Sequence, residues 1–463
     1  MKYRSSLDRR HGGAVAGQCP SRDRRAAATG LFVLLVLTAG AYLPSALYPG
    51  YQHAFRADDL TMTLVHGVFA LVGAGALVLL GPVPDTFGAR PVLRAGIALA
   101  ALGSACFALA TGVGWLIAGH AAQGLALGAT TGAAAALVSE ETAGPGGRRG
   151  AVLAGTAFVA GTAAGAAAGG FLAQYAPAPY VLPFMLHLVL LAVAWYWAGA
   201  LPSRADPTAP AAVDGPGTAD GPGTVHGPGT AAASARLPRP VLPRRVLPRP
   251  VLPRIPRGMR ALFATASAVG FLAWTTAGLF LTVIPALLAR SGRYHPAVTG
   301  CVLAAVLVCS ALTQPLVGRL GARGAQLVGL AGLLTGLSVL SLTAGRSLAL
   351  TLAAAAVAGA GHGLAHAGAA AAVDARAPGA DRSAVTSAFY VSCYLGSGLP
   401  AVAVGLLAVP LPLAAAVSLV TSAAAVLTLL TSAAVAEVDR TARDPKRTIT
   451  YIAVKPFRDD VSA

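Results

Sequence analysis

Charged residues divide the chain into long uncharged stretches separated by short clusters of charge. With histidine counted as neutral, the uncharged stretches are residues 26–55, 60–84, 95–139, 150–203, 261–289, 294–318, 324–345, 347–373 and 383–436. A helix of about 20 apolar residues crosses a bilayer, and a charged side chain at the bilayer centre is costly. Each stretch is therefore long enough, and free enough of charge, to hold at least one membrane-spanning helix.

Three of these stretches, 95–139, 150–203 and 383–436, are about twice as long as one span requires. Each is interrupted near its middle by glycine or proline, at Gly112-Val113-Gly114, Ala176-Pro177-Ala178-Pro179 and Pro410-Leu411-Pro412. Dividing each stretch there predicts twelve spans, six before and six after residues 202–258. No stretch alternates apolar and polar residues as a barrel strand does. We therefore expect an all-α membrane protein with six-helix bundles at residues 26–201 and 259–436.

The composition supports a membrane protein and excludes several soluble classes. Of the 463 residues, 56% are hydrophobic and 11% are charged, and the mean hydropathy is +0.68. A soluble domain carries about 25% charged residues, so this chain has too little charge to cover a surface in water. The five cysteines show no metal-binding or disulfide spacing. A soluble enzyme, a disulfide scaffold and a globally disordered chain are therefore disfavoured.

The positions of lysine and arginine predict the orientation in the membrane. With the N-terminus in the cytoplasm, only Arg56, Arg290, Arg293 and Arg346 of the 34 basic residues fall on the outer side. The positive-inside rule then puts both termini in the cytoplasm. The formal net charge of +17 is explained by this topology and by contact with anionic lipid, not by nucleic-acid binding. The composition, rich in Ala, Gly and Arg, suggests a GC-rich bacterial genome and hence a multi-pass protein of the plasma membrane.

The segments outside the two bundles differ sharply in composition. Residues 202–258 hold three copies of a Gly-Pro-Gly-Thr repeat, at 215–218, 221–224 and 227–230, followed by a run of Leu-Pro-Arg. Such a density of proline and glycine prevents regular structure and predicts a disordered or polyproline-II linker in the cytoplasm. Residues 1–25 and 437–463 are predicted to be cytoplasmic tails.

A short motif follows the second span: Gly81-Pro-Val-Pro-Asp85-Thr-Phe-Gly88-Ala-Arg90. Gly88 allows a tight turn, Arg90 anchors it at the inner leaflet, and Asp85 can form a contact that exists in one conformation only. The motif resembles the loop signature of the major facilitator superfamily, although Pro84 and Thr86 depart from it. The residues alone also fit an ordinary anchored turn. A second copy, Gln314–Arg323, has Gly318 where the aspartate would stand, as expected for internal duplication of the six-helix unit.

The fourth and fifth spans carry two further resemblances to this superfamily. In the fourth span, His120-Ala-Ala-Gln123-Gly124 is similar to a family pattern that has arginine at the position of His120. The resemblance implies a role in proton coupling, whereas the residue alone is equally compatible with a packed histidine. In the fifth span, the glycines resemble the antiporter signature, with Ala166 replacing its proline, and imply a helix-sliding face; generic small-residue packing also explains them. These glycines are Gly161, Gly165, Gly169 and Gly170.

Ionisable residues within a span are functional candidates by default, and the candidates buried in spans here are His66, His120, His187, His362 and His366. No carboxylate lies mid-span; Asp58 and Asp59 precede the second span and are further candidates for coupling. Candidates for lining a central cavity, for which plain packing is the alternative, are Gln123, His362, His366, Trp274 and Tyr390. His362 and His366 lie one helical turn apart, but no third ligand suggests a metal site.

The resemblance implies a secondary transporter with two pseudo-symmetric bundles that works by alternating access, without a cofactor. Because no span holds an arginine, a lysine or a carboxylate, we expect a neutral or weakly charged amphipathic substrate, such as a drug-like molecule or secondary metabolite. Export in exchange for protons is the first hypothesis. An importer or a sugar-efflux facilitator of the same fold, and a non-transporting membrane sensor, are the alternatives. An enzyme is disfavoured because no nucleophile–base pair or cluster of His, Asp and Glu is evident.

Overall fold

The computed structural model describes residues 20–81, 83–141, 148–201, 255–290, 292, 295–344, 346–377 and 382–443. Most of the predicted linker 202–258 and most of both predicted tails lie outside these residues. The predictions made for those segments therefore stay predictions. Within the described residues, every regular element is helical.

The first half of the chain forms the helices that precede the linker. Their bounds are α1 (Pro20–Tyr42), η1 (Leu43–Leu47), α2 (Tyr48–Ala54), α3 (Asp59–Leu80), α4 (Val83–Phe87), α5 (Ala89–Ala108), α6 (Val113–Glu141), α7 (Arg148–Tyr175) and α8 (Leu182–Gly199). Here α4 is a single short turn of helix, and η1 and α2 continue the path of α1.

The second half repeats this arrangement with six long helices. Their bounds are η2 (Arg257–Met259), α9 (Arg260–Arg290), α10 (Pro296–Thr313), η3 (Gln314–Leu316), α11 (Val317–Thr343), α12 (Leu348–Arg376), α13 (Arg382–Leu407) and α14 (Leu413–Arg443). The breaks predicted at Gly112, Pro177 and Pro410 coincide with the turns between α5 and α6, α7 and α8, and α13 and α14. Glycine and proline end these helices as the sequence predicts.

The described helices confirm the predicted twelve-helix fold. Eleven helical segments in the described part of the chain are long and apolar enough to cross a membrane, and one of them, Pro296–Thr343, has 48 residues. A straight helix of that length would extend about 72 Å, more than twice the thickness of the hydrocarbon core. This segment instead contains both α10 and α11, so twelve helices run along the bundle.

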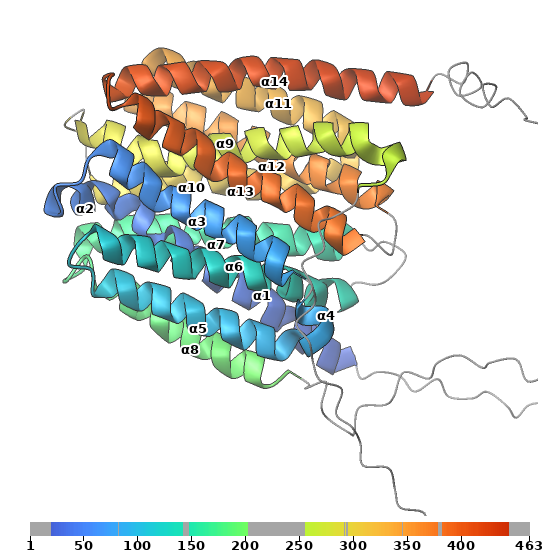
Figure 1. The fold of residues 1–463 in the computed structure, drawn as a ribbon, viewed down its shortest axis with the longest axis horizontal. Coiled ribbons are helices and arrows are strands. Elements are labelled where there is room, and N and C mark those ends of the chain that lie inside the picture. The colour runs from blue at the N-terminus through green and yellow to red at the C-terminus, as the bar shows by residue number, and fades with distance from the viewer. Residues whose placement is uncertain are drawn as a thin grey trace, which may run out of the picture.

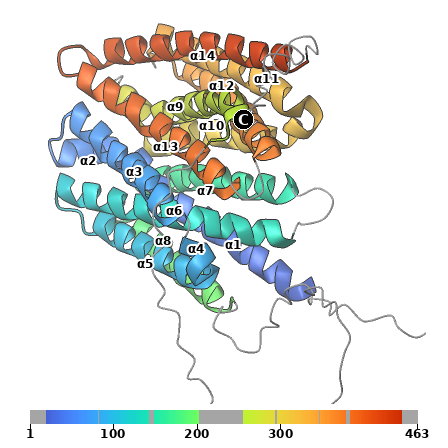
Figure 2. The same cartoon turned by 45° about the vertical axis from the view of Figure 1, so that its right-hand side comes forward.

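All twelve long helices run along one common direction, and the two halves lie side by side (Figures 1 and 2). Between the halves, α3 packs on α13 and α7 packs on α10. We call one end of the bundle the α2 end, because α2 lies there at the left of Figure 1. The opposite end is the Gly88 end, where α4 lies and where the turns at Gly88 and Gly321 are located.

The turns at the Gly88 end have nearly the same backbone conformation in both halves. Gly88, before α5, has φ 84° and ψ 164°, and Gly321, in the kink of α11, has φ 70° and ψ 163°. This region of φ and ψ is essentially restricted to glycine. The Gly-Ala-Arg sequence that the two copies of the motif share therefore corresponds to a shared backbone turn.

Candidate functional site

Close packing of α6 on α3 positions a polar cluster in the first half. Gly124 and Gly128 of α6 lie against backbone atoms of Phe69 and Gly73 on α3, where a Cβ atom would collide. The two helices therefore approach closely enough for His120 of α6 to lie beside α3. His120 is fully buried, and burial alone does not decide between the coupling role that the resemblance implies and a packed, hydrogen-bonded histidine.

His120 makes its contacts within the first half. Its Nε2 atom lies 2.8 Å from the Tyr48 hydroxyl, and its ring meets Phe107 edge to face at 4.9 Å between centroids. Its Nδ1 atom has no hydrogen-bond partner among the described residues. The ring of His66 on α3 lies 6.3 Å away, in a T-shaped arrangement. The first half thus buries two histidines side by side.

His66 differs from His120 because its hydrogen bond crosses to the second half. Its Nε2 atom lies 3.3 Å from the Ser397 hydroxyl oxygen on α13. The Tyr42 ring at the end of α1 lies 6.3 Å from the His66 ring, between centroids. His66 is one of the histidines that the sequence places within a span, whereas no sequence pattern points to Ser397.

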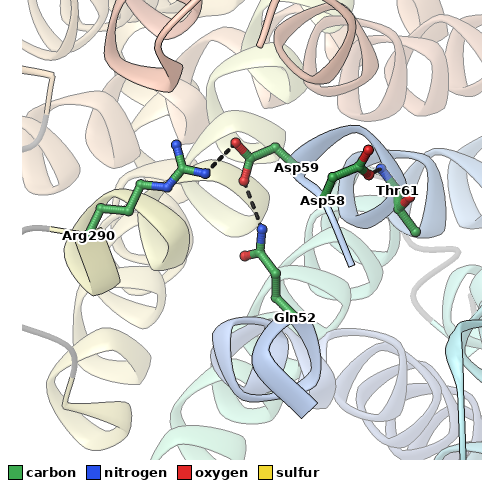
Figure 3. Close-up of polar contacts among 5 residues, drawn as sticks. All are labelled: Gln52, Asp58, Asp59, Thr61 and Arg290. Atoms are coloured by element: carbon green, nitrogen blue, oxygen red, sulfur yellow. Dashed lines mark hydrogen bonds and ion pairs between the residues drawn. The ribbon is translucent and has the colours of Figure 1, made fainter. Parts of the chain in front are cut away.

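A second polar contact between the halves lies at the α2 end (Figure 3). The Asp59 carboxylate accepts a hydrogen bond of 2.6 Å from Nη2 of Arg290 at the end of α9 and one of 2.8 Å from Nε2 of Gln52 on α2. The Asp59 side chain is 12% exposed and that of Arg290 is 53% exposed. One carboxylate therefore holds α2, α3 and α9 together at this end.

The neighbouring Asp58 has a local role in the same close-up (Figure 3). Its side chain accepts a hydrogen bond of 2.7 Å from the backbone N–H of Thr61 and so caps the N-terminus of α3. Hydrogen bonds from the Thr61 hydroxyl and N–H lower the pKa of Asp58 below its ordinary value of 3.8. Of the two aspartates, Asp59 is the one that contacts the second half.

The second half contains a different buried cluster, made mainly of rings. His362 and His366 of α12 stack at 5.8 Å between centroids, and the Trp274 ring of α9 meets both edge to face. The Ser310 hydroxyl lies 2.7 Å from Nδ1 of His362. Tyr390 of α13 lies 6.0 Å from the His366 ring. Four of the five residues predicted to line a cavity are thus brought together.

Two polar atoms of this second-half cluster are candidates for hydrogen bonding to a ligand. Nε1 of Trp274 and Nε2 of His362 are buried, and neither has a hydrogen-bond partner among the described residues. The one ring contact from the first half is that of Phe158 on α7, which meets Trp274 edge to face at 5.7 Å. A buried N–H group without a hydrogen-bond partner is energetically unfavourable, so a ligand that accepts a hydrogen bond from it would remove this desolvation penalty.

Gln123, the fifth predicted cavity residue, lies apart from that cluster. Its Nε2 atom donates to the Ala100 carbonyl and to the Ser104 hydroxyl of α5, each at 3.2 Å. Ser104 in turn contacts Nδ1 of His187 at 2.7 Å, and Nε2 of His187 contacts the Val36 carbonyl oxygen at 2.9 Å. These bonds join α1, α5, α6 and α8 within the first half.

The residues of the loop motif lie at the Gly88 end. Gly81 ends α3, where its N–H donates to the Leu77 carbonyl at 3.1 Å. Arg90 donates to the carbonyl of Leu201, just beyond α8, at 3.4 Å. Asp85 lies in α4, but its side chain is outside the described part of the chain, so its predicted latch contact stays a prediction.

The glycines on one face of α7 pack directly on backbone atoms of α1 and of η1, which follows it. They pair in order, Gly161 with Leu35, Gly165 with Ala39 and Gly169 with Leu43. Gly170 instead faces the second half, where it meets backbone atoms of Pro296 and Gly300 on α10. Three of the four glycines therefore contact a helix of their own half, and one contacts the opposite half.

Sequence spacing contained a partial signal for the contacts between the halves. Asp59 and His66 are seven residues apart, which is close to two helical turns, so they lie on the same face of α3. Both side chains reach the second half. Periodicity therefore identifies the face, whereas it cannot identify Arg290 and Ser397, which are more than 200 residues away. Within the described residues, no group of three or more His, Cys, Asp or Glu side chains is arranged to hold a metal ion.

Comparisons with known proteins agree with this architecture. The model of the Major Facilitator Superfamily matches residues 30–290, more than half of the chain. A bacterial homologue of the human lysosomal transporter Spinster, solved in an inward-facing and unoccupied conformation, is 13% identical with a TM-score of 0.64, over 92% of this chain and 98% of that one. A POT family transporter in complex with 5-aminolevulinic acid is also 13% identical, with a TM-score of 0.63, over 88% and 95% of the two chains.

At this level of identity, the similarity to solved structures concerns the fold alone. No curated protein sequence matches the chain. The family match, the twelve long helices and the packing of two six-helix halves support one another. The chain therefore belongs to the Major Facilitator Superfamily of membrane transporters.

Proposed function

We propose that the protein exports small amphipathic molecules, drug-like compounds or secondary metabolites, in exchange for protons. Transport proceeds by alternating access in the plasma membrane of a bacterium. Both termini are cytoplasmic, so the α2 end faces outward and the Gly88 end faces the cytoplasm. The proposed partners are the substrate, protons and the surrounding bilayer.

The observation that carries this proposal is the set of polar contacts between the halves near the α2 end. Asp59 with Arg290, and His66 with Ser397, join residues of opposite halves. Alternating access requires such contacts to break when the outward side opens and to form again when it closes. The His66 imidazole is a group that can bind a proton, which supports a link between protons and the opening of this side.

The second-half cluster supports the proposed substrate class. His362, His366, Trp274, Tyr390 and Phe158 offer aromatic surfaces together with a few neutral polar atoms. The unpartnered Nε1 of Trp274 and Nε2 of His362 fit a molecule that has both an apolar body and hydrogen-bonding groups. The uncharged spans disfavour a sugar phosphate, a dicarboxylate or a polyvalent cation.

The remaining sequence motifs have proposed roles in the same cycle. Gly81, Asp85, Gly88 and Arg90 form a latch at the cytoplasmic side. Of the α7 glycines, Gly170 meets Gly300 across the interface and allows the halves to move past each other, while Gly161, Gly165 and Gly169 keep α7 close to its own half. His120 and Asp59 are candidates for coupling, and Asp58 serves mainly as a helix cap.

Inverted membrane vesicles that carry a proton gradient test this function. A pH-sensitive dye reports the gradient while lipophilic cations, neutral antibiotics and sugars are added in turn. We expect at least one amphipathic compound to dissipate the gradient only in vesicles that contain the protein. Vesicles from the same cells without the protein are the control.

The outcomes separate the alternatives. Uptake of a labelled compound without dissipation of the gradient would indicate a facilitator. Accumulation only in right-side-out vesicles would indicate an importer. Absence of flux for every compound, with the purified protein folded, would contradict transport and favour a membrane sensor.

A further inference from the structure

We propose that His66 is the residue through which proton binding controls opening of the α2 end. This inference rests on the proposed exchange of substrate for protons and names the group that links the two. It starts from a difference between the two neighbouring histidines. His120 bonds to Tyr48 of its own half, whereas His66 bonds to Ser397 of the opposite half.

The α3–α13 interface around His66 is made largely of small side chains and backbone. Gly67 faces Val402, Gly398 faces Ala70, and Gly73 faces the Tyr394 ring. Such an interface lets the helices approach closely but provides little polar attachment. The hydrogen bond from His66 to Ser397 is therefore positioned to influence whether α3 and α13 stay together.

The groups around His66 are neutral in every direction that the structure describes. Tyr42 comes from α1, His120 from α6 with Tyr48 of α2 behind it, and Ser397 and Tyr394 come from α13. On α3 itself, Phe69 lies 6.0 Å from the His66 ring. The nearest charged groups given by the described contacts are Asp59 and Arg290, about two turns away toward the α2 end, and they are paired with each other.

Protonation of His66 is unfavourable while the halves are closed. The imidazolium would be buried beside a second imidazole and aromatic rings, and no carboxylate contacts it to offset the loss of hydration. Separation of α3 from α13 would admit water from the α2 end to the same ring. By linkage, proton binding then favours the open arrangement, and closing the α2 end favours proton release.

This behaviour fits the proposed direction of transport. When the α2 end is open, His66 takes a proton from outside. When the α2 end closes and the Gly88 end opens, the imidazolium releases this proton to water on the cytoplasmic side, so a full cycle carries one proton inward. His120 stays hydrogen-bonded to Tyr48 of its own half throughout the cycle. Two positively charged rings side by side would repel, so the role of His120 is to limit the pair of His66 and His120 to one proton.

A distance measurement across the two halves tests the inference without requiring a substrate. Spin labels are attached at Leu109→Cys and Val409→Cys, which are 62% and 68% exposed at the α2 ends of α5 and α13. The full chain, with its five native cysteines replaced, is reconstituted in nanodiscs. We expect the open fraction to rise as the pH falls from about 8 to about 5, by at most about tenfold per pH unit for one proton.

The key variant is His66→Gln, which can still hydrogen-bond to Ser397 but cannot accept a proton. We expect it to lose the pH response. His187→Gln is the matched control, because His187 is also buried and bonded to a serine, but that serine, Ser104, lies in the same half. The control variant should respond to pH as the unmodified protein does. Ser397→Ala should raise the open fraction at every pH and keep the response.

Each outcome decides the inference. A wild-type pH response in His66→Gln would overturn it, and so would loss of the response in His120→Gln with retention in His66→Gln. If His66→Gln does not fold, as judged by size-exclusion chromatography, His66→Asn is measured against the same criteria. A pH response that depends on His66 in a protein that transports none of the tested compounds would contradict the proposed export and leave the proton-controlled opening standing.

Discussion

The two halves share a backbone turn, but their buried polar side chains make different contacts. At the Gly88 end, Gly88 and Gly321 have nearly the same φ and ψ angles. Two residues later in each half, an arginine donates to a carbonyl at or just beyond the end of that half's last long helix, Arg90 to Leu201 after α8 and Arg323 to Ala436 in α14. The two halves therefore share the sequence motif, the backbone turn and the arginine contact that follows the turn.

The buried polar clusters have diverged in the residues they contact. The first-half cluster reaches across to Ser397, whereas the second-half histidines contact groups of their own half, His362 the Ser310 hydroxyl and His366 the Cys393 thiol. A duplicated fold needs its turns to stay the same, because a changed turn would misdirect two helices. Buried side chains are free to specialise, and we propose that one half binds protons while the other binds substrate.

The largest expected effect on stability concerns the glycine turns of the two halves and tests whether they are equivalent. Gly88→Ala and Gly321→Ala should each lower the free energy of unfolding by about 1–3 kcal/mol, because both backbones occupy a region that only glycine adopts easily. Thermal unfolding in detergent measures the loss. Gly318→Ala is the control, since Gly318 lies in α11 with open space around it. Unequal losses for Gly88 and Gly321 would argue against equivalent turns.

A smaller effect tests the specialisation of the second half. Trp274→Phe retains the ring but removes the unpartnered Nε1 donor. We expect kcat/KM for export to fall about three- to tenfold for substrates that accept a hydrogen bond, and to change little for those that do not. Trp195→Phe is the control, because Trp195 lies on the exposed side of α8. Equal losses for both substrate types would argue against a hydrogen bond from Trp274.

The contribution of a helix cap to the free energy of unfolding should depend on acidic pH in the first half but not in the second half. Asp58 caps α3 and Ser347 caps α12, and alanine at either position should cost about 1 kcal/mol. The pKa of Asp58 is lowered below its ordinary value of 3.8 by hydrogen bonds from Thr61, so its charged form stabilises the fold at neutral pH. That contribution is lost as the pH falls through the lowered pKa.

Thermal unfolding across acidic pH checks this difference. The gap between the wild type and Asp58→Ala should narrow below about pH 3.8. The gap between the wild type and Ser347→Ala should stay constant, because a hydroxyl does not titrate in that range. A constant gap for both variants would mean that the Asp58 carboxylate does not interact with the α3 N-terminus in the folded protein.

The smallest effect concerns the ion pair between the halves. Arg290 is about half exposed, so Asp59→Asn should change the free energy of unfolding by no more than about 1 kcal/mol. The open fraction at the α2 end should nevertheless rise. A double variant that exchanges the two charges, Asp59→Arg with Arg290→Asp, should restore part of the closed fraction that Asp59→Asn loses. The same spin labels measure it. No recovery in the exchanged pair would indicate that Asp59 acts through Gln52 instead.

The fold was largely predictable because charge is excluded from the bilayer core. Uncharged stretches marked the spans, and Gly112, Pro177 and Pro410 marked the turns within double-length stretches. The site was predictable only in part. The helical period showed that His362 and His366 share a face, but the position of Trp274 against them depends on how α9 packs on α12.

Contacts between distant segments could not be obtained from one sequence. His66 and Ser397 are separated by 331 residues, and no local pattern pairs them. The latch proposed for Asp85 and the character of the linker 202–258 stay predictions, since they concern side chains or segments outside the described residues.

The glycine contacts of α7 have a mechanical consequence. Because Gly161, Gly165 and Gly169 place the α1 backbone directly against α7, these two helices form one stiff lever that cannot slide internally without a collision. Across the interface, Gly170 of this lever meets Gly300 backbone to backbone, and Phe158 of α7 meets the Trp274 ring. Motion between the halves therefore turns the lever as one body about these contacts. We expect the energy barriers of the cycle to be set by the polar contacts that must break, Asp59 with Arg290 and His66 with Ser397.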